Sequence, residues 1–576
     1  MHDNFPSDYT VCLDWQWADW QAHYQRLIET DLNADTIVTW LKAWDIVVRM
    51  NSEVRWRLEL QADLDTTNEI AEKTFTNFIE SIVPEVDKAT FILNKKLVAS
   101  GLAPAALKIP MRLIEAQIKL FNEENLPILT QLSDADMRYR KLRGSQTVAW
   151  DGEEITLNRL RAVFEEPDRE RREKAWHLLQ ECISQDREKI DEIWRDMMQL
   201  RKQIYQNAGL ETYRDYRWLE LGRFDYSPED ALSFVEAIEK TIVPVAKRLR
   251  EDALSELGYD SLRPWDLGLF SHEIVFDLKG RPPLKPYDKM GDFIATSETI
   301  FNQVDTELGS FFRTMKEEKL LDLDNRKGKA PGGYCTMFPY SKRPFIFMNA
   351  VETAGDVTTL LHEAGHAFHV FSMSRQEYIW QWDFDMIPIE FAEVGSMAME
   401  LLATPYLTKD KGGYFTPEEV VRYRSDHLKG IVFALPYMAV VVAFQHWIYT
   451  NHDMATDATK CDEKWVELWN RFIPGVDWSG YEEKMCNRWR LQGHIYGSPF
   501  YYIEYALAQL GAVQVWANSL DDEKSAIAAY KQALNLGGTA TLPQLFEAAG
   551  AKLAFDTETL QKVVDLINRT LAELES

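Results

Sequence analysis

Cysteine is scarce in this chain of 576 residues, and its five copies follow no paired spacing. They form no C-x-x-C motif and are spread along the sequence as Cys12, Cys182, Cys335, Cys461 and Cys486. An odd, dispersed set argues against a disulfide scaffold and against a zinc cluster built on thiolates. Because free thiols persist in reducing compartments, we expect a cytoplasmic protein.

Positive charge is also in deficit, with 64 Lys and Arg residues against 91 Asp and Glu residues and a formal net charge of −27. Binding to nucleic-acid phosphates or to anionic lipids depends on Lys and Arg side chains. We therefore expect neither a nucleic acid nor a membrane as a partner. These numbers do not determine the oligomeric state. We slightly favour a monomer.

Signal-peptide and membrane-spanning patterns are missing as well. The N-terminal sequence MHDNFPSDYTVCLDWQW lacks the basic segment followed by an apolar segment that marks a signal peptide. The strongest apolar run, residues 431–443, contains Pro436 and is closed by Gln445 and His446. It is shorter than the about 20 apolar residues that span a bilayer. We expect a buried helix there and a soluble chain.

Helical patterning dominates the sequence and predicts a mostly α fold with one small sheet. Ser227 and Pro228 suit the N-cap and first position of a helix that runs to about Leu257. In residues 146–157, the Asp151-Gly152 pair between β-prone residues predicts a small hairpin.

Two strands are expected near the middle of the chain, at residues 334–338 and 345–349, joined by residues 339–344. We divide the chain into an N-terminal helical region with the hairpin, residues 1–205, and a catalytic region, residues 206–576. Such a chain is long enough for several domain lengths, and 46% of it is hydrophobic, so it can bury a large core.

A zinc-binding pattern lies in residues 355–370, GDVTTLLHEAGHAFHV. On a helix, His362 and His366 occupy positions i and i+4 and share one face. Two imidazoles on one face can bind a single Zn²⁺, while Glu363 beside them can accept a proton from a water. Thr353, with Asp356 three residues later, caps this helix.

The third metal ligand must lie elsewhere in the chain. One extended zincin pattern places a Gly and a further His after the motif, but His369 and Ser372 occupy those positions. We expect His369 to be a packed core histidine and not a ligand. Glutamates follow within IPIEFAEVGSMAMELL, at Glu390, Glu393 and Glu400. One of them, on a helix crossing the motif, would complete a His₂Glu site that suits zinc without excluding Co²⁺ or Mn²⁺.

Taken together, four stretches resemble the zinc metallopeptidases of the thimet oligopeptidase (M3) family, in its oligoendopeptidase F and Pz-peptidase branch. They are GGYCTMFPYSKRPFIFMN (332–349), GDVTTLLHEAGHAFH (355–369), EFAEVGSMAMEL (390–401) and HIYGSPFYYIEYALAQLGA (494–512). The resemblance implies a two-lobed helical fold around a deep channel with one zinc ion on its floor. It also implies hydrolysis of internal bonds in short peptides.

The resemblance assigns the third ligand as well. The family pattern E-x-x-S-x-x-x-E maps onto Glu393, Ser396 and Glu400, which implies Glu393 as the ligand. Glu390 stays open as an alternative. Glu363 is then the general base that later delivers the proton to the leaving amine.

The C-terminal motif implies donors for substrate binding and for the oxyanion. The matching residues are His494 and three nearby tyrosines: Tyr501, Tyr502 and Tyr505. Among the tyrosines Tyr505 is favoured, followed by Tyr502, which shares a helical face with it. Ser498 and Pro499 suit an N-cap and first helical position, so we expect the tyrosine helix to start there.

By the same resemblance, the strand region 345–349 lines the cleft, where an edge strand can pair with an extended substrate backbone. Cys335 beside it is expected to be a packed thiol.

Two other functions stay open. A dipeptidyl carboxypeptidase would need a cationic anchor such as Arg488 or Arg490, although these could instead balance Glu482 and Glu483. A catalytically silent zinc-containing peptide-binding protein could use the same channel, but it would have no use for Glu363.

Overall fold

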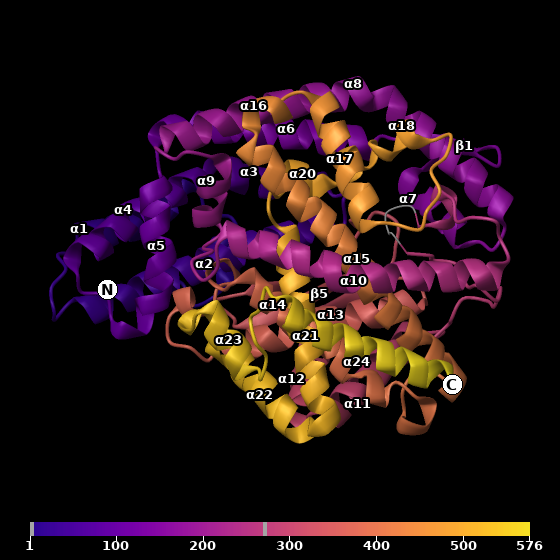
Figure 1. The fold of residues 1–576 in the computed structure, drawn as a ribbon. Coiled ribbons are helices and arrows are strands. Elements are labelled where there is room, and N and C mark those ends of the chain that lie inside the picture. Colours follow the sequence, from indigo (N-terminus) through magenta and orange to yellow (C-terminus); the bar gives the residue numbers. More distant parts are fainter. Residues whose placement is uncertain (1–4, 269–272) are drawn as a thin grey trace. The chain divides into compact units, whose positions relative to one another are not determined.

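The computed structural model describes residues 5–268 and 273–576, which are mostly helical, with 71% helix and 5% strand (Figure 1). The expected helical fold with little sheet is confirmed. Two compact units are formed, each from three separate stretches of sequence. They do not follow the expected division at residues 205 and 206, which falls within helix α8 (Arg169–Asn207). The roles of those two regions as channel wall and catalytic region stay predictions.

The first unit comprises Met1–Lys119, Leu284–Val420 and Gly511–Leu553. Its longer helices are α1 (Trp17–Glu29), α2 (Ile37–Leu64), α3 (Glu69–Ser81), α4 (Val83–Ser100), α11 (Met290–Val304), α12 (Thr306–Glu317), α13 (Ala354–Met373), α14 (Ile389–Leu402), α22 (Glu523–Leu536) and α23 (Leu542–Ala548).

The second unit comprises Leu120–Pro283, Val421–Leu510 and Ala554–Ser576. Its helices, besides α8, are α6 (Leu126–Gly144), α7 (Leu157–Leu160), α9 (Tyr213–Glu220), α10 (Pro228–Leu257), α16 (His452–Ala455), α17 (Ala458–Phe472), α18 (Glu482–Met485), α19 (Arg488–Leu491), α20 (Gly493–Gly497) and α24 (Thr557–Glu575). Three helices have residues in both units: α5 (Lys108–Leu120), α15 (Pro417–Thr450) and α21 (Tyr502–Asp521).

Two local predictions in the second unit are confirmed. Strands β1 (Thr147–Trp150) and β2 (Glu153–Thr156) form the antiparallel hairpin, and both turn residues, Asp151 and Gly152, have positive φ angles. Helix α10 begins after Ser227, whose side chain accepts a hydrogen bond from the backbone N–H of Asp230.

The sheet of the first unit has three strands in the order β3-β5-β4. Strand β4 (Tyr334–Phe338) has the predicted bounds, and β5 (Arg343–Ala350) begins two residues before the predicted strand and ends one residue after it. A third strand, β3 (Leu321–Asp324), was not predicted and pairs in parallel with β5. Strand β5 is therefore the central strand, so residues 345–349 do not form an edge strand; β3 and β4 lie at the two edges of the sheet.

Helix α13 starts where the predicted cap lies. The Asp356 carboxylate accepts hydrogen bonds from the backbone N–H groups of Val351 and Thr353 and from the Tyr287 hydroxyl, at 2.9, 2.8 and 2.7 Å. At its other end, Val370 joins a buried cluster that includes Trp40 and Trp44 of α2. Both ends of the helix that carries the HExxH motif are therefore fixed within the unit.

Helices α13 and α14 pack against each other (Figure 1). A glycine lies at their contact. A Cβ atom added to Gly365 would lie 2.6 Å from the Cα of Ser396 and 2.7 Å from the carbonyl oxygen of Gly395. Both distances are shorter than van der Waals contact, and both neighbours are backbone atoms of α14. Only glycine at position 365 allows the two helices to approach this closely.

One helix, α15, is long and apolar enough to cross a membrane by length and composition alone, and 78% of its apolar window is buried inside the protein. It runs through Pro436 as one buried helix, as the sequence analysis expected.

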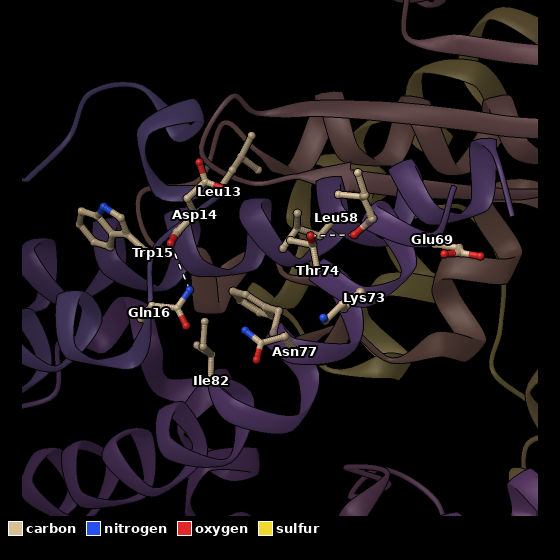
Figure 2. Close-up of a pocket in the computed structure, with 12 residues that line it drawn as sticks. Leu13, Asp14, Trp15, Gln16, Leu58, Glu69, Lys73, Thr74, Asn77 and Ile82 are labelled. Atoms are coloured by element: carbon tan, nitrogen blue, oxygen red, sulfur yellow. Dashed lines mark hydrogen bonds between the residues drawn. The ribbon is translucent and has the colours of Figure 1, made fainter. Parts of the chain in front are cut away.

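A cavity of about 530 Å³ lies in the first unit between the segment that precedes α1 and helices α2 and α3 (Figure 2). Its lining mixes apolar and polar side chains, among them Leu13, Trp15, Lys73 and Asn77. None of the predicted site residues lines it, so the candidate site rests on the geometry around α13 and α14.

Gly365→Ala should separate α13 from α14 and weaken metal binding. Overpacking of this kind costs about 1–3 kcal/mol of stability. We expect zinc affinity, measured by competition with a chelator, to fall in this variant. Gly355→Ala is the matched control, because its Cβ would meet only the Thr353 Oγ1 atom, at 3.5 Å. Equal zinc affinity in the two variants would contradict the close-packing account.

Candidate metal centre

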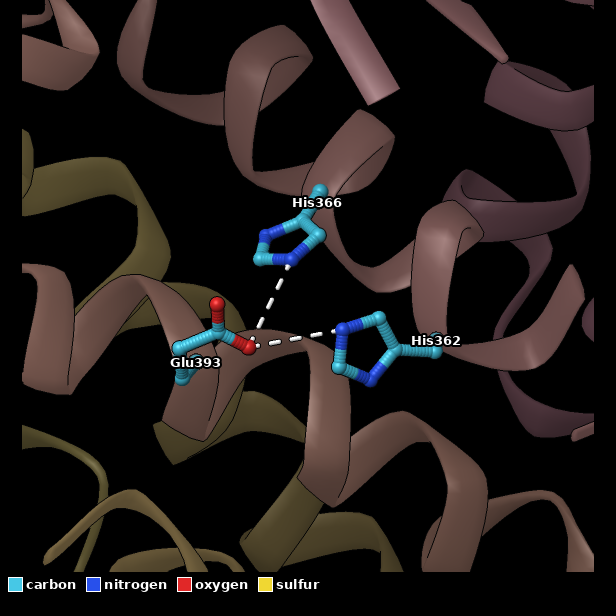
Figure 3. Close-up of side chains that lie close together, drawn as sticks. All are labelled: His362, His366 and Glu393. Atoms are coloured by element: carbon cyan, nitrogen blue, oxygen red, sulfur yellow. Dashed lines mark ion pairs between the residues drawn. The ribbon is translucent and has the colours of Figure 1, made fainter. Parts of the chain in front are cut away.

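Among the described residues, one group of side chains has the composition and spacing of a metal site: His362, His366 and Glu393. One ligand atom from each lies within 4.8 Å of the others. The two histidines come from α13 and the glutamate from α14. Figure 3 shows one carboxylate oxygen of Glu393 directed between the two imidazole rings.

The distances define a shared centre. The Glu393 Oε2 atom lies 3.4 Å from the Nε2 atom of His362 and 3.7 Å from the Nε2 atom of His366. The rings are nearly perpendicular, at 83°, with centroids 5.0 Å apart, as the i and i+4 positions of one helix allow. Glu390, the open alternative, is buried in the first turn of α14 and does not belong to this group.

Two further side chains of α14 orient these ligands. Glu400 Oε1 lies 2.8 Å from the Nδ1 atom of His362, so a proton on Nδ1 leaves the Nε2 lone pair facing the centre. The Ser396 hydroxyl donates to the Oε2 atom of Glu393 at 3.1 Å. The family pattern named both residues, but their contacts came only from the structure.

The electrostatics keep His366 and Glu393 in forms that bind a metal. At His362, burial alone would lower the pKa, but Glu393 and Glu400 raise it well above its usual value, so a bound metal would displace a proton from that ring. Burial lowers the pKa of His366 to about 4, which leaves its imidazole neutral. Burial alone would raise the pKa of Glu393, but His366, His362 and Ser396 together hold that pKa below its usual value. Neutral imidazoles and an ionised carboxylate are the forms that coordinate a cation.

The residues fit a zinc ion. Two imidazole nitrogens and one carboxylate oxygen are the ligand set of many catalytic zinc sites, which keep a further position open. The Nδ1 atom of His366 is buried and has no hydrogen-bond partner among the described residues. The polar contact of this ring is made by its Nε2 atom, which is directed at Glu393.

Glu363 lies next to His362 on α13 but outside the ligand group. Its carboxylate is buried and accepts a hydrogen bond from the backbone N–H of Cys335 on strand β4. Burial raises the pKa of Glu363 to about 7, and a dication bound nearby would oppose that shift. The carboxylate therefore lies between the metal ligands and a sheet edge.

Two further residues near the ligand group are Cys335, which is only partly buried, and His369, which has the core position expected of it. Burial raises the pKa of the Cys335 thiol well above its usual value, which disfavours the reactive thiolate. His369 is fully buried against the edge of Phe391, and burial lowers the pKa of its imidazole to about 3. Neither side chain belongs to the ligand group.

His494 and the three tyrosines form a separate cluster in the second unit. The His494 ring centroid lies 4.9 Å from that of Tyr502, 5.7 Å from that of Tyr501 and 6.5 Å from that of Tyr505. The structure thus brings these four residues together, although their roles stay predictions.

The expected start of the tyrosine helix is wrong. Helix α21 begins at Tyr502 and not after Ser498, because Phe500 has a φ angle of +68° that interrupts the helical path. The backbone N–H of Phe500 donates to the Gln445 side chain at 3.1 Å, and its ring packs near that of His446. Tertiary contacts therefore overrode the local capping signal.

The two candidate cationic anchors are packed within the second unit. Arg490 is buried and donates to the carboxylates of Asp191 and Asp462 at 2.6 Å each. The guanidinium of Arg488 stacks over the ring of Trp469. The partners of Arg490 are therefore not Glu482 and Glu483, as the sequence analysis had suggested.

A sequence model described as peptidase family M3 matches residues 162–564, which is more than half of the chain. The chain belongs to this family. Peptidases of the M3 family depend on a metal, generally zinc. The match covers α13, α14 and the tyrosine cluster, so both candidate groups lie within it.

Individual relatives agree with the family. A solved structure titled Pz peptidase A with an inhibitor superposes with a TM-score of 0.86 at 29% identity, covering 98% of this chain and 99% of that one. Oligoendopeptidase F of Lactococcus lactis subsp. cremoris is 24% identical over 387 residues, and PepF of Bacillus subtilis is 22% identical over 271 residues. These matches cover 64% and 47% of this chain, and 58% and 39% of the two relatives, respectively.

Glu393→Gln should remove a metal ligand and reduce zinc affinity by more than the about 10- to 100-fold that loss of an outer partner costs. Glu390→Gln, three residues earlier on the same helix, is the control and should retain zinc. Zinc content after dialysis against a graded chelator measures both. The reverse order of affinities would make Glu390 the ligand.

Glu400→Gln should weaken zinc binding about 10- to 100-fold, because an amide holds the Nδ1 proton of His362 less strongly than a carboxylate does. The same dialysis series provides the measurement. Wild-type affinity in this variant would show that Glu400 does not orient His362.

Proposed function

We propose that the protein is a zinc-dependent oligoendopeptidase that hydrolyses internal bonds of short peptides. One observation supports this most strongly: two imidazoles and a carboxylate face one point, with the further buried carboxylate of Glu363 beside them. Membership of peptidase family M3 and the similarity to oligoendopeptidase F and to Pz peptidase A point the same way. We also propose a cytoplasmic location, because all five cysteines are free thiols.

His362, His366 and Glu393 would hold one zinc ion. When bound, zinc supplies a Lewis acid that polarises the scissile carbonyl and lowers the pKa of a water to about 7. Glu400 and Ser396 keep two of these ligands in the required orientation.

Glu363 acts as the general base. Its carboxylate accepts a proton from the attacking water and then delivers that proton to the nitrogen of the departing amine. The backbone N–H of Cys335 holds the carboxylate in place through both transfers. Because Glu363 does not belong to the metal-ligand group, its oxygens stay available for the proton.

Strand β4 would receive the substrate. An extended peptide that pairs with a strand edge is held by its backbone, which reads no side chain and so gives broad sequence preference. His494, Tyr502 and Tyr505 would supply neutral donors to the substrate carbonyl and to the developing oxyanion. In this proposal, neutral N–H and O–H groups meet negative charge only as it develops.

The exopeptidase alternative has less support. Recognition of a substrate C-terminus needs a cation that is not already neutralised, and the carboxylates of Asp191 and Asp462 neutralise Arg490. In a catalytically silent peptide-binding protein, the buried carboxylate of Glu363 would have no chemical role.

Glu363→Gln tests the chemical step, because the amide keeps the shape of the side chain but cannot accept the proton. The substrate should be a quenched fluorescent peptide blocked at both ends, which an exopeptidase cannot use. We expect the variant to retain zinc and to lose about 10²- to 10⁴-fold in kcat. Glu377→Gln, at an exposed glutamate beyond α13, is the control and should keep full activity.

Normal turnover by the zinc-loaded Glu363→Gln protein would exclude this residue as the base. Cleavage only of peptides with a free C-terminus would favour the exopeptidase. Bound zinc without cleavage of any peptide would favour the silent peptide-binding protein.

A further inference from the structure

The side chain of Gln492 connects three aromatic residues of the second unit. The Tyr437 hydroxyl on α15 donates to its Oε1 atom at 2.6 Å. Its Nε2 atom lies 2.8 Å from the Nδ1 atom of His494, at the start of α20. The same amide also hydrogen-bonds the phenol of Tyr502, in the first turn of α21. The amide thus contacts residues from three helices.

The orientation of the Gln492 amide, with Oε1 toward Tyr437 and Nε2 toward His494, sets the direction of these bonds. An amide oxygen can only accept and an amide nitrogen can only donate. Because the Tyr437 hydroxyl donates to Oε1, the Nε2 atom of Gln492 faces His494 and donates to Nδ1. Burial raises the pKa of Tyr437 well above its usual value, so this hydroxyl keeps its proton.

The proton of His494 therefore belongs on its other nitrogen. Burial lowers the pKa of His494, which favours the neutral ring. A neutral imidazole carries one proton, and a Nδ1 atom that accepts a hydrogen bond leaves that proton on Nε2. His494 then presents an N–H group, which is a donor, on the side away from Gln492.

We propose that Gln492 is a positioning residue that holds His494 as an Nε2–H donor and binds the Tyr502 phenol beside it. The proposal rests on the proposed function, in which these two residues donate to the substrate carbonyl and to the oxyanion. The opposite tautomer of His494 would direct a lone pair at the carbonyl oxygen and repel it.

His362 provides the internal comparison. A carboxylate, that of Glu400, faces its Nδ1 atom and can only accept, so Nδ1 keeps its proton and Nε2 is the nitrogen that can bind a metal. At His494 an amide nitrogen takes the place of the carboxylate and reverses the arrangement. The hydrogen-bond partner at Nδ1 thus makes His362 a metal ligand and His494 a hydrogen-bond donor. In serine proteases, holding a histidine in the wrong tautomer costs about 10⁴-fold in kcat.

The test uses the zinc-loaded full-length protein labelled with ¹⁵N-histidine. Long-range ¹H–¹⁵N spectra at alkaline pH, where imidazoles are neutral, show which ring nitrogen carries the proton, and His494→Gln identifies the signal. We expect the Nε2–H form in the wild type and in the control Gln561→Met, an exposed glutamine on α24. Gln492→Glu should convert His494 to the Nδ1–H form, because a carboxylate can only accept.

Kinetics on the doubly blocked peptide provide the second readout. Gln492→Glu should lower kcat by about 10²- to 10³-fold, the cost of one oxyanion donor, while KM changes less. Gln492→Met, of similar length but without hydrogen bonds, should lower kcat less than Gln492→Glu does. If Gln492 had a purely structural role, Gln492→Met, which loses every hydrogen bond of this side chain, would lower kcat at least as much as Gln492→Glu does.

The Nδ1–H form in the wild type would overturn the proposal without any substitution, and so would an unchanged tautomer in Gln492→Glu. Wild-type protein that shows the Nε2–H form but cleaves no peptide would overturn the proposed function and uphold the proton assignment. Peptide cleavage by a wild-type protein that shows the Nδ1–H form would support the proposed function and overturn the proton assignment.

Discussion

The contact between α13 and α14 at Gly365 is the constraint on which the site depends. A side chain there would collide with the backbone of α14 at Gly395 and Ser396. Without this approach, the Glu393 carboxylate could not reach the two imidazoles of α13. The cap at the start of α13 and the tryptophan-rich core at its end fix the position of the helix at this crossing.

Hydrogen-bond partners outside the reacting groups assign roles within this protein. The carboxylate of Glu400 at Nδ1 of His362 leaves the Nε2 atom to bind a metal, whereas in our proposal the amide of Gln492 at Nδ1 of His494 leaves the proton on Nε2. Glu363 differs from both histidines. A backbone N–H donates to its carboxylate, and this carboxylate is not one of the three candidate metal ligands. Identical or similar side chains thus take different chemical tasks because different partners hold them.

Part of the metal site and of the fold could be predicted from the sequence. The HExxH motif places His362 and His366 on one helical face, and the hairpin turn needs only Asp151 and Gly152. Other features depended on contacts distant in sequence. Strand β3 is short and pairs in parallel, so its residues carry little signal of their own. Helix α21 begins later than predicted because Phe500 packs against other helices. The sequence shows Gly365 within the motif but not the backbone that approaches it.

X-ray absorption at the zinc edge of the zinc-loaded protein tests the central claim most directly, that one site is formed where α13 crosses α14. The account predicts one zinc ion per chain with two imidazole ligands and oxygen ligands, and no sulfur. A sulfur neighbour at about 2.3 Å would place Cys335 or another thiol on the metal and contradict the account. Three imidazoles would contradict it as well, because His369 or another histidine would then replace Glu393.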